Sequence, residues 1–137
     1  MPLRLTDCPV GSVIICEIYH LFDHCGIYIG DGQIIELAGS GLVRAVSSQR
    51  FLANRSGEHL MALCNQQGLP VGNLAGAERA AGQLFSYQHY DLLHNNCHQF
   101  VGCCLTGQNR QITSFFDLRT ELEQFYRVRL SPELVRP

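Results

Sequence analysis

Cys97 stands at the start of a predicted helix, where a cysteine thiol can act as a nucleophile. Asn95 and Asn96 precede it as candidate N-cap residues, and Gly107 follows where a C-cap is expected. A helix N-terminus carries partial positive charge and unpaired N–H groups, which stabilise a thiolate. The same N–H groups can stabilise the negative charge that develops on an attacked carbonyl. The position favours Cys97 as a nucleophile, although most free cysteines are buried packing residues.

A nucleophilic thiol needs a base, and His24 is the best placed of the six histidines. It opens a glycine-flanked predicted strand over 25–29, and a short turn with the Asp31-Gly32 pair leads to the next strand. Counting outward from that turn brings His24 level with Glu36 or Leu37, so a carboxylate could fix the imidazole tautomer. The alternative for Glu36 is an exposed strand carboxylate.

Four further residues near this pair have candidate roles in the site or in the core. Asn95 and Asn96 could support an oxyanion hole together with the N–H of Cys97, or could only cap the helix. Tyr28 is the candidate for substrate binding, but aromatic residues beside apolar ones are more often part of a core. Cys25 should point to the opposite strand face from His24 and serve as packing.

No metal site is expected from the spacing of possible ligands. The candidates gather near the nucleophile, but their spacing matches no common zinc pattern, and adjacent cysteines rarely bind one ion together. They are His94, Cys97, His98, Cys103 and Cys104. We therefore expect neither a metal nor another cofactor.

The pattern of apolar, glycine and helix-forming residues predicts an α+β fold with an antiparallel sheet packed against the helix that begins at Cys97. Four or five strands are expected, over 13–19, 25–29, 33–37, 42–46 and 59–64, with one or two helical turns between the last two. Further helices are expected over 75–85 and 114–126, the latter capped by Ser114.

Composition limits the class of protein. The chain has 137 residues, of which 46% are hydrophobic and 16% charged, so we expect one folded domain over 1–137. A net charge of -2 gives no electrostatic basis for binding nucleic acid. No apolar run approaches the roughly 18 residues of a membrane span, and the first residues do not resemble a secretion signal. We expect a cytoplasmic location and seven reduced cysteines.

Two segments together resemble a known family. The stretch from His24 to Gly32 (HCGIYIGDG) and the stretch from Asn96 to Val101 (NCHQFV) are similar to the base and nucleophile motifs of the lecithin:retinol acyltransferase family. That family is a circularly permuted branch of the papain-like cysteine hydrolases, related to NlpC-type enzymes. The resemblance covers about residues 8–107 and includes the approach to the nucleophile, 90–97. It implies the same order as here, with the base first and the nucleophile last.

This chain departs from the family pattern at two places. Glu36 stands where the family usually has a second histidine, and His98-Gln99 stands where it has Glu-His. The resemblance implies thiol-dependent acyl transfer or hydrolysis through a cysteine thioester, with a small-molecule or lipid acyl substrate. Two alternatives remain open: a peptidase or amidase of NlpC type acting on a peptide or other amide, and a catalytically silent binding module with the same fold.

Overall fold

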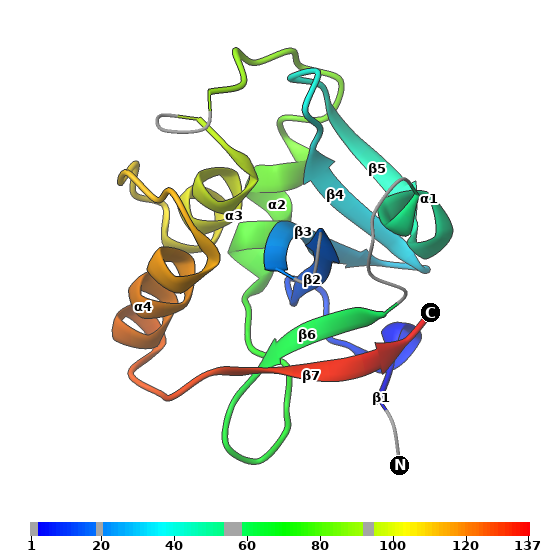
Figure 1. Ribbon diagram of the computed structural model, residues 1–137, viewed down its shortest axis with the longest axis vertical. Helices are drawn as coiled ribbons and strands as arrows, with labels where there is room; N and C mark the ends of the chain where they lie inside the picture. The colour runs from blue at the N-terminus through cyan, green and yellow to red at the C-terminus, as the bar shows by residue number, and fades with distance from the viewer. Residues whose placement is uncertain (1–2, 19–20, 54–58, 92–94) are drawn as a thin grey trace.

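The computed structural model describes residues 3–18, 21–53, 59–91 and 95–137 and shows a mixed α+β architecture. Figure 1 shows a curled sheet with helices beside it. The sheet order is β1-β7-β6-β2-β3-β4-β5. The strands are β1 (Leu3–Arg4), β2 (Val13–Ile18), β3 (Leu21–Gly30), β4 (Gln33–Leu37), β5 (Val43–Ser47), β6 (Leu60–Cys64) and β7 (Ser131–Arg136). The helices are η1 (Leu5–Asp7), α1 (Ser48–Leu52), α2 (Leu74–Ala81), α3 (Cys97–Thr106) and α4 (Phe115–Tyr126).

The turn between β3 and β4 sets the register of the site. Asp31 and Gly32 both have positive φ, 53° and 74°, which is the backbone of the tight hairpin turn predicted from this pair. The two strands then pair antiparallel, with Ile27 opposite Ile35. In this register Gly26 is level with Glu36, and His24 lies two residues from Gly26 on β3. His24 and Glu36 are therefore diagonal neighbours on the same face of the sheet.

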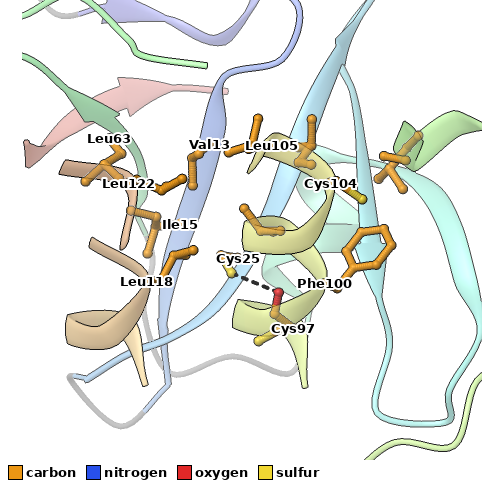
Figure 2. Close-up of a cluster of buried hydrophobic side chains, with 14 of the residues drawn as sticks. Val13, Ile15, Cys25, Leu63, Cys97, Phe100, Cys104, Leu105, Leu118 and Leu122 are labelled. Carbon is orange, nitrogen blue, oxygen red and sulfur yellow. Dashed lines mark hydrogen bonds between the residues drawn. The ribbon is translucent and has the colours of Figure 1, made fainter. Parts of the chain in front are cut away.

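Strands β2 to β6 contribute side chains to two separate apolar clusters, one on each face of the sheet. The helix-side cluster joins the sheet to α2, α3 and α4, and its members include Val13, Ile15, Cys25, Cys97, Phe100 and Leu118. Part of it is drawn in Figure 2. The far-side cluster lies on the opposite face, and its members include Ile14, Tyr28, Ile34, Phe51, Leu60 and Val135. The sheet is therefore buried on both faces, which explains the near-continuous apolar runs in β2 and β6.

The expected sheet of four or five antiparallel strands is wrong in size and in part of its pairing. The sheet has seven strands, and β1 pairs with β7 in parallel. Strand β7 pairs antiparallel with β6 on its other side. Its sequence is SPELVR, which contains one proline and two charged residues, and Val135 is its one buried residue. A pattern this polar carries no period-2 signal, so local sequence could not reveal the strand.

The helices follow the sequence more closely. Helix α3 begins at Cys97, and Gly107 adopts the expected left-handed C-cap with φ 73°. Helix α4 begins after Ser114, whose side chain accepts the N–H of Asp117. Helix α2 ends at Ala81 rather than at 85, because the chain turns at Gly82. The expected end of the first strand, Tyr19, lies outside the described residues. Within the described ranges no helix has the length and hydropathy needed to cross a membrane.

Candidate active site

Cys97 occupies the first position of α3, and its place there is fixed by the residue before it. The Asn96 side chain accepts the N–H of Gln99 at 2.9 Å and donates to the carbonyl of Ile112 at 2.7 Å. The first bond caps the helix and the second ties its start to the segment before α4. Asn96 is therefore a capping residue, which is one of the two roles expected for it. The cap orients the first turn of α3, including the N–H of Cys97.

The surroundings of Cys97 favour its thiolate. A hydrogen bond with the Cys25 thiol is the largest influence and lowers the pKa of Cys97, whereas burial of the sulfur raises it. Hydrogen bonds with His24 and His98 lower the pKa further, so that it lies well below the ordinary value for a cysteine. Since Cys97 is only 1% exposed, these contacts replace water as the groups that stabilise the charge.

His24 is held by a chain of charged and polar groups that extends across the sheet. Its Nε2 lies 2.7 Å from Oε1 of Glu36, and the Arg44 Nε donates to Oε2 of Glu36, also at 2.7 Å. The expected approach of Glu36 to His24 is therefore present. Glu36 is only 1% exposed, so the alternative of an exposed carboxylate is wrong. Arg44 was not foreseen, although it lies directly opposite Glu36 in the pairing of β4 with β5.

Glu36 is ionised in spite of its burial. Burial acts to raise its pKa, but the hydrogen bonds and positive charges of His24 and Arg44 outweigh this, and the net pKa is lowered. A carboxylate at this position accepts the Nε2–H of His24, which leaves Nδ1 as the ring nitrogen available to Cys97. The order of groups is therefore thiol, imidazole, carboxylate and guanidinium.

Packing beneath the imidazole depends on a glycine. The ring of His24 lies 4.8 Å from the ring of Phe51, measured between centroids. Gly26 follows His24 by two residues on the same strand face, and a Cβ there would come within 2.6 Å of the Ile35 carbonyl oxygen and 3.1 Å of the Phe51 ring. The pairing of β2 with β3 also shifts register just beyond the pair Cys16 and His24. Irregularities of this kind redirect side chains, and they are common beside active sites.

Tyr90 contacts the nucleophile through its hydroxyl group. The phenol oxygen accepts the backbone N–H of Cys97 and also forms a hydrogen bond with its thiol. Burial, followed by the negative charge of Cys97, raises the pKa of Tyr90 to about 12, so the phenol keeps its proton. From the sequence, Tyr90 could only be grouped with other aromatic residues near the motif. Its place seven residues before Cys97 gives no pattern from which this contact could be predicted.

Cys25 and His98 also meet at Cys97. The Cys25 sulfur lies 3.4 Å from the Cys97 carbonyl oxygen and 3.5 Å from Nδ1 of His98. Figure 2 shows the first of these contacts, with the sulfur directed at the first turn of α3. Cys25 does point away from the face that carries His24, as predicted, but that direction brings it to the nucleophile instead of into passive packing. Burial is the main reason that the pKa of Cys25 is raised well above the ordinary value.

Other predicted residues lie away from the sulfur. Tyr28, the residue predicted for substrate binding, is 2% exposed within the far-side cluster, and its hydroxyl accepts the N–H of Gly32. The Asn95 side chain donates to the carbonyl of His89 and to the Gln88 side chain, which directs it away from Cys97. Of the predicted metal candidates, His94 lies outside the described residues.

A pocket of about 340 Å³ follows the side of α3 that carries Gln99 and Cys103. Amide side chains dominate its lining, and no lining residue carries a formal charge. The lining consists of Gln83, Gln88, Asn95, Gln99, Phe100, Cys103 and Asn109. Cys97, His24 and Tyr90 are not among the lining residues, so the pocket lies along α3 and does not contain the nucleophile itself.

The chain matches no model of a known protein family and no curated protein. Its function therefore has to be inferred from the geometry at Cys97.

Proposed function

We propose that this protein is a papain-like cysteine hydrolase or acyltransferase, in which Cys97 forms a thioester with the acyl group of its substrate. The observation that carries the proposal is the thiol whose pKa is lowered at the start of α3, together with the hydrogen bond of His24 to the buried Glu36. Perturbed ionisable groups that converge in this way are typical of nucleophilic sites.

The reaction begins with proton transfer from Cys97 to His24. The thiolate attacks the carbonyl carbon, and the oxygen becomes an anion near the N–H of Cys97 and the phenol of Tyr90. His24 then returns the proton to the leaving group, and a thioester remains on Cys97. Water or another acceptor, activated by His24, releases the acyl group and restores the thiol. Because Tyr90 already accepts the N–H of Cys97, its hydroxyl must shift when the substrate oxygen takes that place.

Glu36 and Arg44 act on this reaction through His24. The carboxylate holds the imidazole with Nδ1 toward the sulfur and stabilises the positive ring formed after proton transfer. Arg44 in turn keeps Glu36 ionised, since it is the second partner of that carboxylate. Both are positioning residues, because neither reaches the reacting atoms.

A permuted papain-like fold of the lecithin:retinol acyltransferase type is the architecture that this proposal favours. Support comes from the order of the base strand before the nucleophile helix, and from the antiparallel strands β2 to β5, of which β3 contacts α3. The carboxylate of Glu36 meets the base at the place where that family has its second histidine.

Two classes of substrate are compatible with this reaction. A lipid acyl substrate requires an apolar cleft near the nucleophile, whereas a peptide or another amide fits a polar groove. The pocket along α3 combines amide side chains with the apolar atoms of Phe100 and Cys103, so it can accept either kind of substrate. We therefore propose acyl transfer from Cys97 as the reaction, with an ester of a lipid and a neutral amide as the two substrates to compare.

Single-turnover acylation by an activated ester, followed by intact mass, tests the reaction. The native chain should gain one acyl group, and Cys97→Ala should gain none. The matched control is Cys8→Ser, because Cys8 lies in the far-side cluster and its bond to the Arg4 carbonyl can be kept by serine. This control should acylate at the native rate.

The proposal is contradicted if Cys97→Ala is still labelled, or if no ester, thioester or amide probe labels the native chain. A binding module with the same fold would then be the interpretation that remains. The substrate class follows from rates with two matched probes, a medium-chain acyl ester and a neutral peptide amide. A faster reaction with the amide supports the NlpC-type alternative.

A further inference from the structure

We infer that Cys25, Cys97 and His98 form a binding site for one zinc ion, and that this ion blocks the Cys97 thiol. The three side chains come from two elements that are far apart in the sequence, β3 and α3. All three are buried, and their possible ligand atoms lie within 4.8 Å of one another. This site does not depend on Cys97 being catalytic, because the ligands bind the ion whether or not the thiol attacks a substrate.

The donor set and its spacing fit zinc. Two thiolates and one imidazole are ligands that Zn²⁺ prefers, and three protein ligands with an open fourth position occur in its non-structural sites. With Zn–S bonds of about 2.3 Å and Zn–N bonds of about 2.0 Å at tetrahedral angles, a sulfur and a nitrogen on one ion lie about 3.5 Å apart. The measured separation of the Cys25 sulfur from Nδ1 of His98 is 3.5 Å.

Charge compensation also favours a divalent ion here. A buried thiolate is costly unless a positive charge or several hydrogen bonds offset it. Two thiolates and Zn²⁺ together have no net charge, so the bound site would be neutral in the core. Because cysteine binds zinc as a thiolate, the ion would displace any proton on the two thiols when it binds.

The spacing of the three ligands along the chain explains why the zinc site could not be predicted from the sequence. Cys25 is 72 residues before Cys97, and Cys97 and His98 are adjacent, so no common zinc pattern is formed. The adjacent pair can share one partner because Cys25 approaches the first turn of α3, where it contacts both residues. A bound ion would occupy the sulfur required for acylation, so the site would act as a reversible inhibitory site.

Titration of the reduced, chelator-treated protein with Co²⁺ tests the inference without any acyl substrate. The native chain should bind one equivalent and show thiolate-to-cobalt charge-transfer absorption with the visible bands of tetrahedral Co²⁺. Zn²⁺ should then displace the cobalt and abolish these bands. Zinc should also raise the melting temperature in a concentration-dependent way, since it binds the folded state.

The ligand variants are Cys25→Ser, Cys97→Ser and His98→Gln, with Cys8→Ser as the matched control. Loss of a partner outside the ligand set typically costs 10–100-fold in affinity, so each ligand variant should lose at least about 100-fold. Cys8→Ser should bind as the native chain does. If Cys25→Ser does not fold, the Cys97 and His98 variants and X-ray absorption of the native zinc complex, with two sulfur ligands and one histidine, decide the question.

The inference is overturned if the native chain shows no thiolate-to-cobalt absorption, or if all ligand variants bind as tightly as the native chain. Its failure is separate from failure of the proposed function, because acylation is measured with a chelator present and metal binding without an acyl donor. If acylation succeeds and cobalt does not bind, Cys25 and His98 serve only as hydrogen-bonding partners of the nucleophile.

Discussion

The two faces of strand β3 carry neighbouring residues that both contact Cys97 but belong to different environments. On the helix side, Cys25 lies in an apolar cluster and contacts the first turn of α3. On the far side, His24 packs on Phe51 and binds Glu36, which in turn binds Arg44 at the partly exposed edge of the sheet. One face therefore supplies a neutral thiol donor, and the other supplies a base with a charged chain behind it.

This difference separates two kinds of support for the nucleophile. The hydrogen bond from Cys25 stabilises a thiolate but offers no route for its proton, because burial keeps the Cys25 thiol protonated. The imidazole of His24 can accept the proton, since Glu36 and Arg44 compensate the positive charge that it gains. Proton transfer should therefore depend on residues on the far side of the sheet. Burial of the Cys97 sulfur should depend on residues on the helix side.

The largest expected effect comes from breaking the far-side chain. Glu36→Gln keeps the shape of the side chain and removes its charge, and acylation should slow by about 10²–10⁴-fold, as for other groups that orient a catalytic imidazole. Arg44→Gln should have a smaller effect of about tenfold, because Arg44 reaches only Glu36. The measurement is single-turnover acylation against pH, in which Glu36→Gln should shift the profile. An unchanged rate and profile in Glu36→Gln would assign the positioning role to another group.

The next largest effects are expected from truncating one core side chain on each face of the sheet. Phe51→Ala and Leu118→Ala should each lower the free energy of unfolding by about 2–5 kcal/mol, because both leave a cavity in a packed cluster. Below their melting temperatures, Phe51→Ala should also slow acylation, since His24 loses the ring on which it packs. Leu118→Ala should acylate nearer to the native rate. Denaturant unfolding and acylation at matched stability check this, and equal loss of activity in both variants would contradict the separation of the faces.

Tyr90→Phe should slow acylation by about 10²–10³-fold, which is the usual loss of rate when one oxyanion donor is removed. The variant removes only the hydroxyl group, and the fold should be unchanged because the ring still packs on the helix-side cluster. Stopped-flow acylation with a good and a poor leaving group provides the test. If the phenol contacts only the resting thiol, the two leaving groups will be affected alike and by less than tenfold.

The smallest expected effect is on stability in acid. The pKa of Glu36 is lowered in the folded protein from the ordinary 4.5, so its contribution is present above that value and is lost as pH falls through the lower folded value. The net effect is small because burial opposes the His24 and Arg44 partners. Unfolding free energy measured from neutral pH into acid should decline less steeply for Glu36→Gln. Parallel curves for the two proteins would show that Glu36 does not contribute to the acid dependence.

Local sequence signals predicted the helices and strands of the site better than the tertiary contacts between them. The Asn96 cap, the start of α3 and the tight hairpin were all readable because each depends on residues close together in the chain. The approach of Glu36 to His24 followed from the hairpin register. The contacts of Cys25 with His98, and of Tyr90 with Cys97, depend on how α3 lies on the sheet. Periodicity does not encode that arrangement.

Strand β7 has a consequence for how the chain folds. It lies between β1 and β6, so the pairing of Leu3 with Val135 joins residues from nearly opposite ends of the sequence. In Figure 1, strands β1, β6 and β7 lie at a distance from helix α3. Contacts over such a span close late, because the entropy of a very long loop must be overcome first. During synthesis, a ribosome-bound chain complete only through α4 would hold the residues of the candidate site while β6 still presents an unpaired edge, which is a template for aggregation until β7 pairs with it.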